Sequence, residues 1–297
     1  EETDSKSRFV KRFASRHVTN PYIRPVIEIS FDDSMQDHHG NFLFDVSGSI
    51  FLKNYGRSDS SNIVSGSGLT EITGTDCMKV KLVKGNYSFT TNASQHTRGT
   101  GGQPVAGLYS ASFAIPSNVT TEYTQGKKLA GLISDKKKVT FDEFWYSNDG
   151  SVGYHTGSLT IEVSERTTDN LLSFDPEIYA TNLKHEYYKK DTERVRLYGI
   201  DHSNNFNISS KKSIRRTSDI FENVYYRVRD RDTGKMIFDF GEDDNSTRVS
   251  TDNQGMFFDF KFSPLPAGRT YTFEYLITMR GLRLVVQDSR SNFRIDK

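Results

Sequence analysis

Apolar and polar residues alternate along most of the chain, and turn-forming Gly, Asn and Asp residues interrupt the alternation at short intervals. Within residues 107–115, the more apolar side of the alternation is formed by Tyr109, Ala111, Phe113 and Ile115. A period of two bounded by turn residues is typical of half-buried strands in an antiparallel sheet. The pattern therefore predicts a chain dominated by strands and turns.

Several more strands are predicted between residues 37 and 166. Together with 107–115 they cover residues 41–45, 48–55, 78–83, 86–91, 139–146 and 153–163. In the strand at 139–146, one carboxylate, Glu143, falls on the same side as Val139, Phe141 and Trp145. This segment is expected to form one β-sandwich.

Residues 167–297 show the same pattern of short alternating segments separated by turn residues. Predicted strands cover residues 194–200, 224–229, 235–240, 256–262, 271–279, 282–286 and 292–295. Gly234 ends the turn between the second and third of these, where a tight connection needs a positive φ. About seven short strands in such a length are typical of an immunoglobulin-like sandwich. We therefore expect an all-β chain with two tandem immunoglobulin-like antiparallel sandwiches, at 37–166 and 167–297.

Residues 1–36 are predicted to hold the last strands of an upstream sandwich and a linker. A basic lead-in is followed by a strand at 26–31, in which Ile27, Ile29 and Phe31 share one face. Residues 32–40 are polar and indicate a solvated connection.

Composition narrows the function classes. The chain has 297 residues and a formal net charge of +1, so it has no general attraction for nucleic acid or for anionic lipid. No apolar run approaches the roughly 20 residues of a membrane helix. Cys77 is the single cysteine, which excludes an internal disulfide. We expect neither a nucleic-acid nor a membrane partner.

No catalytic constellation interrupts the strands. The densest set of potential metal ligands is Asp32, Asp33, Asp37, His38 and His39. Adjacent histidines in an extended chain point to opposite faces, so a solvated linker is the favoured interpretation over a metal site. The acidic run 239–244 lacks the spacing of a calcium loop and is interpreted as a charged turn. We expect no enzymatic activity, no catalytic residue, no metal and no cofactor.

One group of aromatic residues offers an alternative. Trp145, Tyr146 and Tyr154 come together if the strands at 139–146 and 153–163 pair. Exposed, they would form a stacking platform for a glycan in an adhesive or carbohydrate-binding module. Buried, Trp145 would be a central core ring, and we favour this interpretation. An accessory domain of a polysaccharide-degrading enzyme is a further, weaker hypothesis.

Two sets of residues resemble known families. Residues 13–17 and 24–33 resemble the closing strands of DNRLRE-type jelly-roll domains, with Ser15-Arg16 ahead of Arg24-Pro25. The remainder resembles large virion structural proteins of contractile-tailed marine bacteriophages. The segments that carry this resemblance are residues 41–42, 49–54, 107–115, 144–147, 154–158, 194–198, 224–228, 257–260 and 266–271.

The bacteriophage resemblance implies a non-enzymatic virion component of the neck, tail or baseplate. It implies chains of immunoglobulin-like sandwiches that contact other virion structural proteins, and we expect a symmetric homo-oligomer. A glycan partner belongs only to the adhesive alternative.

Overall fold

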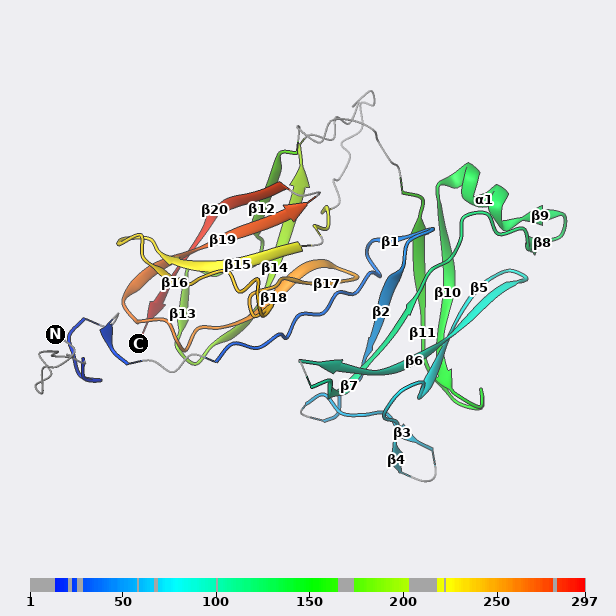
Figure 1. Ribbon diagram of the computed structural model, residues 1–297, viewed down its shortest axis with the longest axis horizontal. Helices are drawn as coiled ribbons and strands as arrows, with labels where there is room; N and C mark the ends of the chain where they lie inside the picture. Colours follow the sequence, from blue (N-terminus) through cyan, green and yellow to red (C-terminus); the bar gives the residue numbers. More distant parts are fainter. Residues whose placement is uncertain are drawn as a thin grey trace, which may run out of the picture.

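The structure is a computed structural model that describes residues 14–20, 23–25, 29–57, 59–66, 69–99, 101–164, 174–202, 218–221, 223–279 and 282–296 (Figure 1). Within these ranges the chain forms two β-rich bodies, and the extended N-terminal segment runs along the C-terminal body before it enters the N-terminal body at β1. In the same ranges, no helix is long and apolar enough to cross a membrane.

The N-terminal body is built on a seven-stranded sheet. Its strands are β1 (Phe42–Leu43), β2 (Gly48–Lys53), β5 (Met78–Lys84), β6 (Tyr87–Arg98), β7 (Gln103–Phe113), β10 (Lys138–Ser147) and β11 (Gly153–Glu162). They follow the order β1-β11-β10-β5-β6-β7-β2, and β1 runs parallel to β11. The strands predicted between residues 41 and 163 are thus confirmed, with shifted ends.

The two edge strands of this sheet, β1 and β2, follow each other in the sequence with only four residues between them. The sheet therefore has to bend round on itself, and one core lies inside the bend. The pattern-forming residues Tyr109, Ala111, Phe113, Ile115, Val139, Phe141 and Trp145 all belong to this core.

Smaller elements complete the N-terminal body. Two ribbons pair β3 (Val64–Ser65) with β4 (Thr70–Glu71) and β8 (Glu122–Thr124) with β9 (Lys127–Lys128). The short helix α1 (Leu129–Lys136) was not predicted, and only two of its residues, Leu129 and Ile133, are fully buried. It ends at Lys136, and the C-cap residue that follows, Lys137, adopts a left-handed φ of 60°.

The C-terminal body consists of two sheets facing each other across an aromatic core. One sheet has the order β12-β14-β18-β17 and the other β13-β20-β19-β15-β16. The strands are β12 (Pro176–Ala180), β13 (Glu186–Tyr188), β14 (Thr192–Asp201), β15 (Asn223–Asp230), β16 (Met236–Phe238), β17 (Ser250–Asp252), β18 (Gly255–Lys261), β19 (Arg269–Met279) and β20 (Leu282–Asp296).

Predicted strands of this body are confirmed, except that 282–286 and 292–295 belong to one strand, β20. The core is held by ring contacts such as Tyr187 on Phe262, with centroids 3.9 Å apart, and Tyr226 on Phe258, at 4.1 Å. The two bodies share no core residue. The predicted boundary at 166/167 lies outside the described residues.

The strand predicted at 26–31 is not formed by residues 29–31, which have no regular structure and lie exposed. Ile29 is 78% exposed and Phe31 62%. The alternation of apolar residues is present, but no neighbouring strand in the described part of the chain pairs with this segment. Residues 26–28 and most of the basic lead-in lie outside the described residues.

Candidate functional site: the joint between the two bodies

Residues 32–40, called the linker here, precede the N-terminal body in sequence and lie along the edge strand β17 of the C-terminal body. Ser250 Oγ accepts a hydrogen bond from Met35 N at 3.0 Å, and Thr251 N donates to Met35 O at 2.8 Å. Asp37 N donates to Thr251 O at 3.3 Å, and Thr251 Oγ1 donates to Asp37 O at 2.9 Å. The linker therefore extends this sheet by one short parallel bridge, and it covers an edge that would otherwise be open.

Two residues further on, the linker enters the N-terminal body through His39. The ring lies between two carboxylates, with Nδ1 2.6 Å from Asp37 Oδ1 and Nε2 3.0 Å from Glu143 Oε2. Trp145 Nε1 donates to the other Glu143 oxygen, Oε1. The result is a continuous chain of hydrogen bonds from Asp37 to the core ring of Trp145.

The position of Glu143 explains why such a network is needed. It lies on the inward side of β10 between Phe141 and Trp145 and is only 2% exposed. A buried carboxylate is costly unless it is paired and hydrogen-bonded. Burial alone raises its pKa, but the contacts from His39 and Trp145 outweigh burial and lower the pKa of Glu143.

The histidine responds in the opposite direction. Burial alone would lower its pKa, yet the hydrogen bonds and negative charges of Asp37 and Glu143 raise the pKa of His39 to about 10. At neutral pH His39 is therefore a partly buried cation shared by the linker and β10.

The neighbouring linker residues are also closely fitted. His38 N donates to Ser49 O at 2.9 Å, and His38 Nδ1 accepts a hydrogen bond from Ser49 N at 3.0 Å. A Cβ atom on Gly40 would lie 2.9 Å from Ile220 Cδ1 and 3.1 Å from the backbone oxygen of Asp252. Gly40 thus lets the linker approach the C-terminal body more closely than another residue could.

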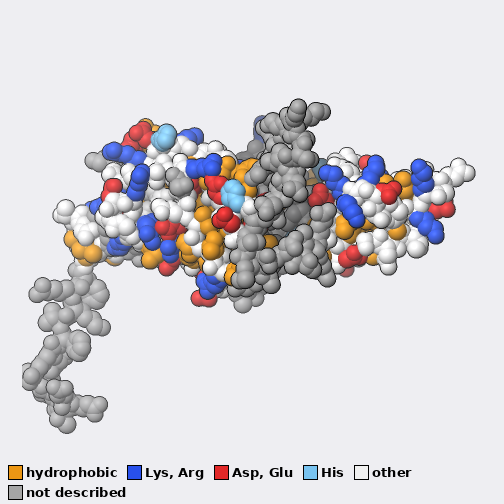
Figure 2. All heavy atoms as spheres, turned by 90° about the horizontal axis from the view of Figure 1, so that it is seen from above, with side chains coloured by type: hydrophobic (Ala, Val, Ile, Leu, Met, Phe, Trp, Pro, Cys, Tyr) orange, Lys and Arg blue, Asp and Glu red, His pale blue; other side chains and the backbone are white. Residues whose placement is uncertain are grey.

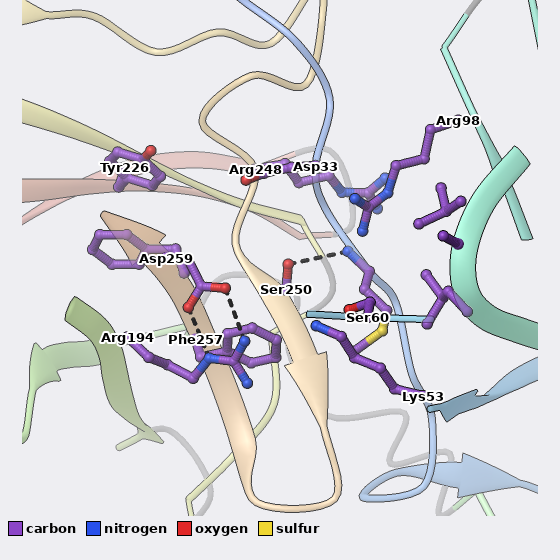
Figure 3. A pocket seen from close by; sticks show the side chains of 15 residues that line it. Asp33, Lys53, Ser60, Arg98, Arg194, Tyr226, Arg248, Ser250, Phe257 and Asp259 are labelled. Atoms are coloured by element: carbon purple, nitrogen blue, oxygen red, sulfur yellow. Dashed lines mark hydrogen bonds and ion pairs between the residues drawn. The ribbon is translucent and has the colours of Figure 1, made fainter. Parts of the chain in front are cut away.

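A cavity of about 150 Å³ opens where the two bodies and the linker meet (Figure 3). Its charged and aromatic lining residues are Asp33, Lys53, Arg98, Arg194, Tyr226, Arg248, Phe257, Phe258 and Asp259. Figure 3 shows Arg194 with Asp259 and Phe257 at one end, and Arg98 and Arg248 with Asp33 at the other.

At the end with Arg194, the charge of this residue is paired within the protein. Arg194 donates two hydrogen bonds to the carboxylate of Asp259, at 2.7 and 2.8 Å. Its guanidinium also lies over the ring of Phe257, 4.2 Å from the centroid. This bidentate pair raises the pKa of Arg194 further above its usual value.

The cluster Asp32, Asp33, Asp37, His38 and His39 was interpreted as a solvated linker, and this interpretation is wrong for its second half. Asp37 is buried, and His38 and His39 are half-buried and hydrogen-bonded. The sequence signal was the carboxylate of Glu143 within an apolar stripe, which requires a cationic partner. Among the described residues no group of three or more His, Cys, Asp or Glu side chains is arranged to hold a metal ion.

The three residues of the glycan alternative do not form one exposed platform. Trp145 is 1% exposed and belongs to the core, so a sugar ring has no access to its face. Tyr146 and Tyr154 are half-buried, and Tyr154 packs against the core cluster.

The acidic run 239–244 forms a turn with surface ion pairs. Glu242 pairs with Arg283, Asp239 lies 3.5 Å from Arg227, and Asp244 accepts a hydrogen bond from Ser246 N. Over the face shown in Figure 2, acidic and basic side chains are interspersed rather than gathered by sign.

No family model and no curated protein matches the chain. Among solved structures, it is similar to a titin A168–A169 structure at 9% identity, covering 90% of this chain and 98% of that one, with a TM-score of 0.23. It is also similar to an activated alpha-2-macroglobulin from Escherichia coli at 10% identity, covering 90% and 17%, with a TM-score of 0.24. A biofilm-associated protein BSP domain matches at 13% identity, covering 84% and 29%, with a TM-score of 0.20. At these scores the likenesses carry no conclusion about function.

Proposed function

We propose that the chain is a non-enzymatic structural element that holds two β-sandwich bodies in a fixed relative orientation. The observation that carries the proposal is the linker, which is hydrogen-bonded to β17 on one side and to the buried Glu143 on the other. A flexible tether would leave these polar groups to solvent. Here these groups are hydrogen-bonded and buried, so a change of orientation would leave them unpaired and cost free energy.

We further propose that the C-terminal body is immunoglobulin-like. The sheet β12-β14-β18-β17 has the order A-B-E-D of that fold, when its strands are lettered in chain order. In the facing sheet, β20-β19-β15 has the order G-F-C, and β13 and β16 are additional edge strands. Tyr271, near the start of β19, donates its hydroxyl to Pro266 O at 2.7 Å across the preceding corner. This contact corresponds to the tyrosine corner found in that fold.

The N-terminal body supports a related assignment. Its first strand runs parallel to its last, as β13 does to β20 in the other body. Its long strand β6 pairs with β5 through its first half and with β7 through its second half. The chain would then be a tandem pair of immunoglobulin-like bodies in which one strand, β6, changes sheets.

The setting we propose for this rigid pair is a bacteriophage virion, in the neck, tail or baseplate. This part rests on the sequence resemblance given above. The partners would be other virion structural proteins and further copies of the chain in a symmetric homo-oligomer, where repeated copies raise avidity.

The assembly proposal is tested by native mass spectrometry of the purified chain, followed by probing purified tailed virions with an antiserum against it. A symmetric oligomer and a virion-associated signal are expected. A chain that stays monomeric over a range of ionic strengths and is absent from virions would overturn the virion assignment, while the rigid joint would still be open to its own test by scattering.

A further inference from the structure

The cavity between the two bodies has an excess of positive charge. Four of its lining residues are cationic (Lys53, Arg98, Arg194 and Arg248) and two are acidic (Asp33 and Asp259). Arg194 and Asp259 neutralise each other. The other three cations share the cavity with one further carboxylate, Asp33, which forms an ion pair with none of them among the described contacts.

Two of these cations also have unused hydrogen-bond donors. The Nε atoms of Arg98 and Arg248 are buried and have no hydrogen-bond partner among the described residues. Arg248 uses one terminal nitrogen to donate to Asn223 Oδ1 at 3.1 Å, which fixes the direction of its guanidinium. Buried donors of a charged group are costly to leave unpaired, and no acceptor for these two nitrogens lies among the described residues, so an anion beside the two guanidinium groups would offset this cost.

The size and donor type restrict what that acceptor is. A cavity near 150 Å³ holds a ligand about as large as benzene, and a nucleotide would not fit. Guanidinium groups present planar forks of donors that match the oxygens of phosphate, sulfate and carboxylate. We propose that this cavity binds one small oxyanion between Arg98 and Arg248.

The two arginines belong to different bodies. Arg98 ends β6 of the N-terminal body, whereas Arg248 precedes β17 of the C-terminal body. An oxyanion held by both therefore binds only to the docked arrangement and adds a second connection beside the linker. By mass action, a ligand that binds only this arrangement stabilises it.

The test is a thermal-unfolding titration of the intact chain with sodium phosphate, at an ionic strength held constant with sodium chloride. Wild-type protein should unfold at higher temperature as phosphate rises, and isothermal titration calorimetry should give one site per chain. R98Q and R248Q should each lose the phosphate-dependent shift. Sulfate and acetate, titrated in the same way, rank tetrahedral against carboxylate oxyanions.

R231Q is the matched control, because Arg231 is exposed and outside the cavity, and its replacement changes the net charge equally. It should retain the full shift. Phosphate and sulfate also stabilise proteins generally by exclusion from their surfaces, which would shift all variants equally. An equal shift in all four proteins, or none in the wild type, overturns the proposal.

R98K covers the case in which R98Q does not fold. It keeps the charge and most of the stem but removes the fork. If the fork is what binds, R98K should retain the wild-type unfolding temperature in chloride and show a smaller phosphate shift. A full phosphate shift in R98K would rule out recognition by the Arg98 fork.

Discussion

At the scale of single residues, the core of the N-terminal body contains a carboxylate that the strand pattern placed there. Glu143 takes an inward position on β10, and His39 compensates it from outside the strand. Removing one partner of a buried ion pair costs more than the pair itself contributes, because the other charge is left uncompensated. His39 is thus the cation that compensates the buried charge of Glu143.

H39Q should lower the free energy of unfolding by about 3–5 kcal/mol at neutral pH, the usual cost of breaking a buried pair. Urea denaturation of wild type and variant measures the difference. H202Q is the control, since His202 pairs with Glu177 on the surface with 42% and 32% of the side chains exposed. Its cost should lie within about 1 kcal/mol. Equal effects of the two substitutions would contradict the buried network.

The same contact makes stability depend on pH. The pKa of His39 is raised from 6.5 to about 10, so its contribution is complete below about pH 6.5 and is lost as pH rises toward 10. The gap in unfolding free energy between wild type and H39Q should therefore narrow steadily over that interval. A gap that is constant from pH 6.5 to 10 would show that His39 is not charged in the fold.

At the scale of elements, strand β19 is fixed at the start of its buried stretch. Tyr271 is fully buried and its hydroxyl bonds to the corner that leads into the strand. Y271F leaves the ring in place and removes only the hydrogen bond, so the Pro266 carbonyl loses its partner. A loss of about 1–3 kcal/mol is expected in chemical denaturation.

Y188F is the control for this substitution, because Tyr188 is 54% exposed. It should change stability by a few tenths of a kcal/mol, within the range of neutral surface substitutions. If Y271F changed stability as little as Y188F, the hydrogen bond from Tyr271 to Pro266 would contribute nothing to the stability of the C-terminal body.

The elements also show what the sequence can and cannot predict. Strands with a full period of two, such as β7 and β10, were predicted because alternation records burial directly. β17 has only three residues and β13 three, too few for a period to be visible. The pairing of His39 with Glu143 spans 104 residues and depends on how the linker folds back. Neither this pairing nor the cavity with Arg98 and Arg248 produces a recognisable pattern in neighbouring residues of the sequence.

At the scale of the whole molecule, the orientation of the two bodies depends on a close backbone approach at Gly40. G40V should push the linker away from Ile220 and Asp252 and loosen the joint. Small-angle scattering should then show a broader distribution of distances than in the wild type.

G153V is the matched control, because a Cβ on Gly153 meets nothing within 4 Å and this glycine has no positive φ. Its scattering profile should equal that of the wild type. Identical profiles for all three proteins would show that the docked linker does not set the orientation.

The parallel pairing of β1 with β11 and of β13 with β20 determines how the molecule meets tension. In a parallel pair that joins a strand at or near the start of a body to its last strand, pulling on the two ends slides the strands along each other. All hydrogen bonds between them are then loaded together, whereas an antiparallel hairpin pulled from its open end would lose them one at a time. The N-terminal body therefore has a shear clamp between its first and last strands, and in the C-terminal body the clamp joins the last strand to β13, one strand after the start.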